Sequence, residues 1–201
     1  MTAIIDYDAG NLKSVEKTLA ALGEKTVVSR DEKTILSADK VILPGVGSFG
    51  DAMEKLHQYG LVEVIRQAVE KKIPLLGICL GLQLFFESSE ESPGVKGLSL
   101  LPGKVVHFPK ETGLKVPHMG WNSLDIKPGS RLFKGIDPGA YVYFVHSYYL
   151  RADRETDVAA SAEYGVKFAA SVERGPLFAC QFHPEKSSGT GLKILKNFIE
   201  L

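Results

Sequence analysis

The chain has 201 residues, of which 44% are hydrophobic and 24% charged, and its formal net charge at pH 7 is zero. This composition is that of an ordinary globular protein, and it gives no electrostatic reason to expect binding to nucleic acid or to an anionic membrane. No apolar run approaches the roughly 20 residues of a membrane span, and the N-terminus lacks the basic and apolar regions of an export signal. Two cysteines in such a chain favour a cytoplasmic location over a disulfide. The length predicts one domain over residues 1–201.

The first half of the chain alternates short apolar runs with helical patterns. Strands are expected at 3–7, 26–28 and 40–43, and helices at about 12–22 and 51–72, the second broken near Tyr59 and Gly60. Asn11 precedes the first helix and is expected to be its N-cap. Strands that alternate with helices predict an α/β fold, with a doubly wound, mostly parallel sheet and helices on both faces.

The segment from Pro74 to Gln83 contains an apolar run, the turn Gly77-Ile78-Cys79-Leu80-Gly81 and a second apolar run. This order predicts a strand, a sharp turn and a helix, which is the nucleophile elbow with cysteine in place of serine. Glycine on both sides of the cysteine lets strand and helix approach closely, and a helix N-terminus favours a thiolate. A buried cysteine that only packs in the core is the alternative interpretation.

The loop from Pro44 to Gly50 follows the third expected strand and contains three glycines in seven residues. Its backbone N–H groups can approach a ligand closely, and ligands of open α/β sheets bind beyond the carboxyl ends of the strands. The loop is therefore expected to face Cys79 and to donate a hydrogen bond to an oxyanion. A flexible turn and a phosphate-binding loop are the alternatives, although no Gly-Lys-Ser/Thr follows.

The second half of the chain is richer in strand patterns, which predict antiparallel strands added to the parallel core. Strands are expected at 103–108, 116–126, 141–150, 158–172 and 177–182. A final helix is expected at about 189–201, with its buried face marked by Leu192, Leu195, Phe198 and Ile199.

A cysteine nucleophile needs a general base, and His183 is the strongest candidate among the five histidines. It ends an apolar strand, and Pro184 restricts it to the extended region. If the backbone stays extended, Glu185 lies on the same face as His183 and orients the imidazole. A solvated histidine and glutamate at a strand end is the alternative.

Gly77-x-Cys79-x-Gly81 followed by a late His183-Pro184-Glu185 resembles the triad glutamine amidotransferases, or class I glutaminases. The segments 44–50, 117–122, 143–148 and 182–187 are similar to the glutaminase subunits of imidazole glycerol phosphate synthases. The resemblance covers essentially the whole chain and implies a single flavodoxin-like glutamine amidotransferase domain.

The resemblance also implies the chemistry. Cys79, His183 and Glu185 would hydrolyse glutamine to glutamate and ammonia through a cysteinyl thioester, without a metal or an organic cofactor. The backbone of Gly45, Val46, Gly47 and Leu80 would hold the oxyanion. Glutamine would be bound by Gln83, Ser147 and Tyr148.

The length leaves no residues for a domain that uses the ammonia, so a partner is expected. The resemblance implies a heterodimer with a (βα)₈-barrel cyclase subunit, which makes imidazole glycerol phosphate and aminoimidazole carboxamide ribotide in histidine biosynthesis. The docking face beside an ammonia tunnel would comprise Pro117, His118, Met119, Trp121, Asn122 and Tyr143. Ordinary packing in a β core is the alternative for Trp121 and Tyr143.

Three other functions remain open from the sequence. The chain could serve a different synthase, such as pyridoxal phosphate synthase or anthranilate synthase. It could be a partner-independent cysteine hydrolase or peptidase of similar fold. It could also be a non-catalytic binding module, for which Cys79 would be dispensable.

Overall fold

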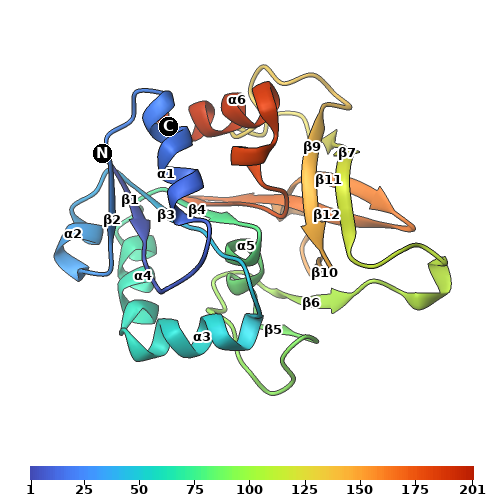
Figure 1. The fold of residues 1–201 in the computed structure, drawn as a ribbon, viewed down its shortest axis with the longest axis horizontal. Coiled ribbons are helices and arrows are strands. Elements are labelled where there is room, and N and C mark those ends of the chain that lie inside the picture. Colours follow the sequence, from blue (N-terminus) through green and yellow to red (C-terminus); the bar gives the residue numbers. More distant parts are fainter.

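The computed structural model describes the backbone of residues 1–201 and every side chain except that of Thr112. A twisted sheet forms the centre of the molecule, with helices on both of its faces (Figure 1). Its parallel part has the strand order β2-β1-β3-β4-β13, which is the order of flavodoxin-like folds. These strands are β1 (Thr2–Ile5), β2 (Thr26–Ser29), β3 (Lys40–Leu43), β4 (Leu75–Ile78) and β13 (Leu177–Cys180).

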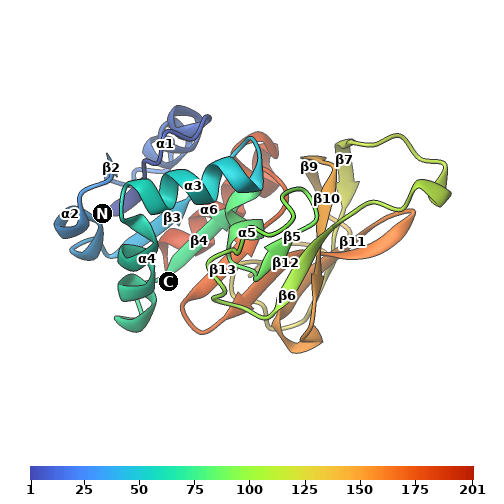
Figure 2. The same cartoon turned by 90° about the horizontal axis from the view of Figure 1, so that it is seen from below.

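The helices bury apolar side chains against the two faces of this sheet. One face is covered by α1 (Leu12–Ala21) and α6 (Ser188–Ile199). The other face, seen in Figure 2, carries α2 (Glu32–Leu36), α3 (Phe49–Gln58), α4 (Leu61–Glu70) and α5 (Leu80–Leu84). Successive residues of a strand point to opposite faces, so Ile4 belongs to one apolar cluster and Ile5 to the other. The predicted α/β class is confirmed.

Antiparallel strands extend the sheet beyond β13, as the second half of the sequence predicts. They are β12 (Val166–Arg174), β10 (Tyr148–Ala152), β11 (Val158–Tyr164), β6 (Gly103–His107) and β8 (Asp125–Ile126), with β5 (Ser88–Ser89) parallel to β6 at the edge. Short 3₁₀ helices are η1 (Lys110–Thr112), η2 (Glu155–Asp157) and η3 (Pro184–Lys186).

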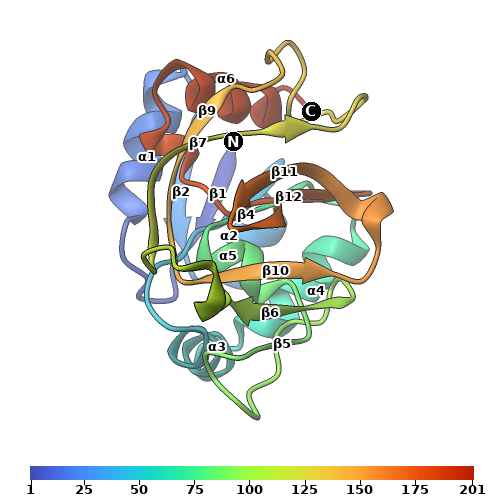
Figure 3. The same cartoon turned by 90° about the vertical axis from the view of Figure 1, so that its right-hand side faces the viewer.

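A separate two-stranded sheet stands beside the main one and is seen from its outer side in Figure 3. It pairs β7 (His118–Ser123) with β9 (Tyr141–His146) in antiparallel register. This register places Trp121 opposite Tyr143 and His118 opposite His146. The β7–β9 sheet therefore connects the segments expected to dock a partner with those expected to bind glutamine.

The structure corrects several details of the predicted elements. The expected strands 116–126, 141–150 and 158–172 are each divided into two strands. The short helix α2 is not among the predicted elements, and Leu192 is 40% exposed although it is expected on the buried face of α6. The buried stripe of α6 runs through Ile194, Leu195 and Phe198, so Leu192 lies off it by about one helical step. None of the helices that the structure describes has the length and apolar character needed to cross a bilayer.

Candidate active site

The predicted elbow at Cys79 is present between β4 and α5. Cys79 has φ 55° and ψ −106°, a strained conformation for a residue with a side chain. A Cβ atom on Gly81 would lie 1.9 Å from the Leu43 carbonyl oxygen, and one on Gly77 would lie 2.7 Å from the Gly81 oxygen. The turn closes only because both positions are glycine. Its backbone is fixed further by a hydrogen bond of 2.8 Å from the Cys79 N–H to the Cys180 carbonyl.

His183 and Glu185 form a buried pair just beyond the end of β13. Their Nδ1 and Oε1 atoms are 2.8 Å apart, and their side chains are 1% and 0% exposed. His183 is extended, as expected for a residue before proline, with φ −99° and ψ 97°. The backbone does not stay extended, however, because η3 begins at Pro184. The expected contact forms, but the 3₁₀ turn makes it and the strand geometry used to predict it is wrong.

The electrostatics of this pair favour an imidazolium beside a carboxylate. Burial alone would lower the pKa of His183, but the neighbouring Cys79 and Glu185 outweigh it and raise this pKa to about 9. Burial likewise opposes the charge of Glu185, yet hydrogen bonds, chiefly from His183, keep its pKa below the ordinary value. Among the described residues, His183 Nε2 is buried without a hydrogen-bond partner. Nδ1 is thus engaged by Glu185, and Nε2 is left for a reacting group.

Cys79 and His183 line a common cavity of about 340 Å³, which suits a small ligand. The residues expected around the nucleophile and the substrate also line it: Val46, Gly47, Leu80, Gln83, Ser147 and Tyr148. Val46, Gly47, Leu80 and Gln83 follow β3 or β4 at the carboxyl ends of these strands. Ser147 lies between β9 and β10, and Tyr148 begins β10. The structure therefore brings the expected triad, oxyanion and substrate residues to one place.

The loop expected to hold an oxyanion presents a carbonyl oxygen to its neighbour. The Leu80 N–H donates to the Gly45 oxygen at 3.4 Å, so an expected oxyanion donor is already engaged. Tyr7 also contacts this loop: its buried hydroxyl donates a hydrogen bond to the Pro44 carbonyl oxygen at 2.8 Å. A Cβ on Gly45 would lie 2.3 Å from that hydroxyl, and Gly47 has φ +100°. The loop therefore needs glycine at both positions.

Gln83 lines the cavity and is hydrogen-bonded to the fully buried Gln181. Gln83 Nε2 donates to Gln181 Oε1 at 3.0 Å and to the Tyr148 carbonyl at 3.2 Å. Gln181 Nε2 in turn lies 3.7 Å from the Cys79 sulfur. Gln181 was missed by the sequence analysis. Its position two residues before His183, within the strand expected at 177–182, is the signal that could have found it.

His118 and His146 form a hydrogen-bonded pair at one end of the β7–β9 sheet, and His146 also lines the cavity. His146 Nδ1 donates to the Tyr148 carbonyl at 2.8 Å, and His118 Nδ1 donates to His146 Nε2 at 2.9 Å. The carbonyl can only accept, which fixes both tautomers. Burial lowers the pKa of His118 to about 4 and that of His146 to about 3, so both rings are neutral at pH 7. His118 is buried and does not contribute to the expected docking face.

The remaining residues of that face differ in exposure. Met119 and Trp121 are 62% and 50% exposed, and Tyr143 is half-buried with its ring 6.1 Å from that of Trp121. Pro117 and Asn122 are also half-buried. An exposed fraction of this size excludes core packing for Trp121. The side chains of Met119 and Trp121 form an apolar surface on the β7–β9 sheet.

Comparison with known proteins identifies the family. Residues 3–201 match the family model "Glutamine amidotransferase class-I". The chain is 55% identical over 199 residues to the imidazole glycerol phosphate synthase subunit HisH of Moorella thermoacetica, covering 99% of this chain and 94% of the relative. It is 51% identical over 203 residues to the subunit of the same name from Syntrophotalea carbinolica, covering 98% of each.

A solved structure described as a glutamine amidotransferase has the same fold. Its TM-score is 0.76 at 19% identity, and the match covers 98% of this chain and 97% of the other. The chain therefore belongs to the class-I glutamine amidotransferases, in the family of the HisH subunits of imidazole glycerol phosphate synthase.

Proposed function

We propose that this chain is the glutaminase subunit of an imidazole glycerol phosphate synthase, which hydrolyses L-glutamine to L-glutamate and ammonia for use by a cyclase subunit. The observation that carries the proposal is the meeting of Cys79, on its strained elbow, with the buried His183–Glu185 pair beside one cavity. A nucleophile, a base and an orienting carboxylate are what cysteine-dependent amide hydrolysis requires. The names of relatives that are 55% and 51% identical support the choice of synthase.

In the proposed reaction, the Cys79 thiolate attacks the side-chain carbonyl carbon of glutamine, and negative charge develops on the former amide oxygen. Protonated His183 transfers its Nε2 proton to the amide nitrogen, so the C–N bond breaks and ammonia leaves. Water, deprotonated by His183, then hydrolyses the glutamyl thioester and releases glutamate and the thiolate. Glu185 remains ionised throughout and holds the imidazole in place. These steps use no metal or organic cofactor.

The oxyanion formed in this reaction needs donors that the resting loop does not offer. With the Leu80 N–H bonded to the Gly45 oxygen, the Gly45–Val46 peptide must turn over before its N–H and that of Leu80 can bind the oxyanion. Each such donor contributes about 3–4 kcal/mol to the transition state in other acyl-transfer enzymes. The glycines of this loop give it the backbone freedom to turn. We infer that the partner favours the turned state. Without the partner the loop stays in the resting state, so little glutamine is hydrolysed when its ammonia cannot be used.

The cyclase subunit is proposed to dock on the apolar surface of Met119 and Trp121, with Tyr143, Pro117 and Asn122 around it. Strand β9 carries both Tyr143, beside this surface, and His146, in the cavity wall. A partner on this surface is therefore a short distance along one strand from the site where ammonia is released. This arrangement supports transfer of ammonia without its escape into solvent.

The test compares glutamine and ammonium salts as nitrogen sources for the complex of this chain with the cyclase subunit. Cys79→Ala should abolish synthesis from glutamine and leave synthesis from ammonium salt intact. If both activities are lost, Cys79 has a structural role. If glutamine still supports synthesis, Cys79 is not the nucleophile.

A second experiment tests the choice of synthase. The chain is mixed with the cyclase subunit or with the synthase subunit of an anthranilate or pyridoxal phosphate synthase, and glutamine is supplied. Only the cyclase is expected to receive ammonia. Transfer to another synthase would contradict the assignment, and rapid hydrolysis of peptides without a partner would favour a general cysteine hydrolase.

A further inference from the structure

The loop between β1 and α1 brings Asn11 to the buried carboxylate of the triad. Asn11 Nδ2 donates to Glu185 Oε1 at 2.6 Å, although the two residues are 174 positions apart. The same oxygen bonds His183 Nδ1 at 2.8 Å. Among the described residues, the cavity lining includes Cys79 and His183 but neither Glu185 nor Asn11. Asn11 therefore reaches the triad through Glu185 and not through the substrate.

The burial of Glu185 makes this contact important. Its side chain is 0% exposed, and its Oε2 atom is buried without a hydrogen-bond partner among the described residues. A buried carboxylate keeps its charge and its orientation only through the donors that reach it. Burial tends to raise the pKa of Glu185, and hydrogen bonds from His183 and then Asn11 help to outweigh this. Without Asn11, a single side-chain donor would hold the carboxylate.

The backbone of Asn11 shows that its amide is diverted from an ordinary task. Asn11 occupies the N-cap position of α1, with φ 72° and ψ 4°, but its side chain makes no capping hydrogen bond. An N-cap asparagine normally bonds the first turn of its helix. Asparagine also tolerates the left-handed conformation, as glycine does, so the backbone alone does not require an amide here.

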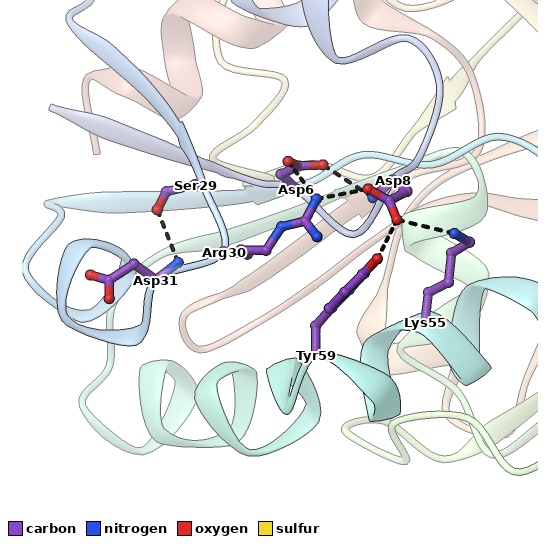
Figure 4. A network of polar contacts seen from close by, with 7 residues as sticks. All are labelled: Asp6, Asp8, Ser29, Arg30, Asp31, Lys55 and Tyr59. Atoms are coloured by element: carbon purple, nitrogen blue, oxygen red, sulfur yellow. Dashed lines mark hydrogen bonds and ion pairs between the residues drawn. The ribbon is translucent and has the colours of Figure 1, made fainter.

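Asp8, in the same loop as Asn11, contacts polar and charged side chains of neighbouring elements (Figure 4). Asp8, at φ 62°, binds Arg30 at 2.7 Å and Lys55 at 3.1 Å, and it also accepts a hydrogen bond from Tyr59. Arg30 follows β2, whereas Lys55 and Tyr59 belong to α3 and its end. Exposed pairs of this kind add little stability singly. Together they restrict the loop that places Asn11.

We propose that Asn11 is a positioning residue, whose amide holds the Glu185 carboxylate so that His183 keeps Nδ1 bonded and Nε2 available for proton transfer. The proposal rests on the proposed glutaminase function. Because Asn11 acts through Glu185, its loss lowers the rate of the chemical steps and leaves glutamine binding unchanged.

The test uses Asn11→Gly and Asn11→Asp in the complex with the cyclase subunit. Both residues tolerate the left-handed backbone. Glycine has no side chain to donate a hydrogen bond to Glu185, and an ionised aspartate has no proton to donate. In each variant kcat for glutamine hydrolysis should fall about tenfold or more, with KM within about twofold of the wild type. Wild-type kcat in both variants would show a backbone role alone and overturn the proposal. A raised KM at constant kcat would also overturn it, because Asn11 would then bind substrate.

The pH profile gives a readout that a structural role would not move. Loss of the Asn11 donor raises the pKa of Glu185, so the acid limb of kcat/KM should shift to higher pH. The shift should be larger for Asn11→Asp, which places a second carboxyl group beside Glu185. An acid limb unchanged in both variants would count against the proposal.

A double-mutant cycle tests whether Asn11 acts through Glu185. In a Glu185→Gln background, Asn11→Gly should change kcat by less than about twofold, since the carboxylate it positions is gone. If Asn11→Gly lowered kcat in that background by the same factor as in the wild type, the proposal would be overturned.

Two parallel assays separate this inference from other failures. Synthesis from ammonium salt should be unchanged in the Asn11 variants, and its loss would overturn the proposal in favour of a structural role. If wild-type glutaminase activity survives Cys79→Ala, the proposed function itself fails. If activity depends on Cys79 but tolerates Asn11→Gly, only the positioning role is refuted.

Discussion

The backbone N–H of Leu80 donates to the carbonyl oxygen of Gly45 at 3.4 Å, directly beside the candidate nucleophile. In the proposed reaction, a carbonyl oxygen in this place would repel the oxyanion, and it occupies an N–H group expected to donate to that oxyanion. The His183–Glu185 pair and the cavity lined by Cys79 and His183, by contrast, are present in this chain without a partner.

This relationship predicts slow glutamine hydrolysis by the chain alone. Relative to the complex with the cyclase subunit and its acceptor nucleotide, kcat should be lower by about 100-fold or more, the effect of losing one oxyanion donor. KM for glutamine should change little, because Gln83, Ser147 and Tyr148, which are expected to bind glutamine, lie outside this loop. Steady-state release of glutamate, measured with and without the partner, checks both quantities. Equal kcat values would show that the Leu80–Gly45 hydrogen bond does not limit the reaction.

The raised pKa of His183 predicts the alkaline limb of the activity. His183 must be protonated to release ammonia, and its pKa is about 9, so kcat/KM should fall above about pH 9. Glu185→Gln removes a charge that stabilises the imidazolium, so the limb should move to lower pH. His57→Gln, on the exposed side of α3, is the matched control and should leave the limb in place. A limb that Glu185→Gln does not move would contradict the role given to this carboxylate.

The exposed Trp121 predicts a strong contribution to partner binding. Trp121→Ala should weaken the complex by about 2 kcal/mol or more, as central aromatic residues of interfaces do. Its effect on the unfolding free energy of the isolated chain should stay within about 0.5 kcal/mol, because the side chain is half exposed. Trp121 is the sole tryptophan of the chain, so its fluorescence reports docking directly.

A control variant separates this effect from general loss of apolar surface. Leu192→Ala removes an exposed apolar side chain from α6 and should leave the affinity unchanged. A fluorescence spectrum that the cyclase subunit does not alter would place the interface elsewhere.

The neutral His118–His146 pair predicts a loss of stability in mild acid. Both histidines have folded-state pKa values near 4 and 3, below the unfolded value of 6.5, so the unfolded chain binds their protons first. As the pH falls below about 6.5, each therefore costs up to about 1.4 kcal/mol of unfolding free energy per pH unit. Urea unfolding between pH 6 and 5 measures this slope.

The variants that test this slope are His118→Gln and His57→Gln. The first should reduce the slope by about one proton, and the second should not change it, since His57 is exposed. A slope that His118→Gln leaves intact would mean that His118 is not the group that resists protonation.

The parallel strands, the elbow and the His183–Glu185 contact are predictable because each has a local signal. Apolar runs separated by helical patterns mark the parallel strands, and glycines around Cys79 mark the turn. The breaks between β9 and β10 and between β11 and β12 lie inside longer strand patterns, so each pair was expected as one strand. Glu185 was found although the expected extended backbone is a 3₁₀ turn, because a spacing of two residues allows contact in both geometries. Leu192 was misplaced because its helix has more apolar residues than its buried stripe can hold.

The remainder depends on contacts between distant segments, which no local pattern reveals. Asn11 has the signal of an N-cap and bonds a carboxylate 174 positions away. The orientation of the Gly45–Val46 peptide is decided by its neighbour Leu80, because glycine permits several conformations. His118 is expected on the docking face, but the pairing of β7 with β9 buries its side chain against His146.

Glutamine hydrolysis through a thioester on Cys79 should leave a covalent intermediate that can be trapped. The complex is quenched with acid during turnover, and its peptides are analysed by mass spectrometry. We expect one glutamyl group on the peptide that contains Cys79, none on the peptide of the buried Cys180, and no adduct in Cys79→Ala. Glutamate formation by Cys79→Ala at the wild-type rate, without any adduct on the wild-type peptide, would contradict a thioester on Cys79.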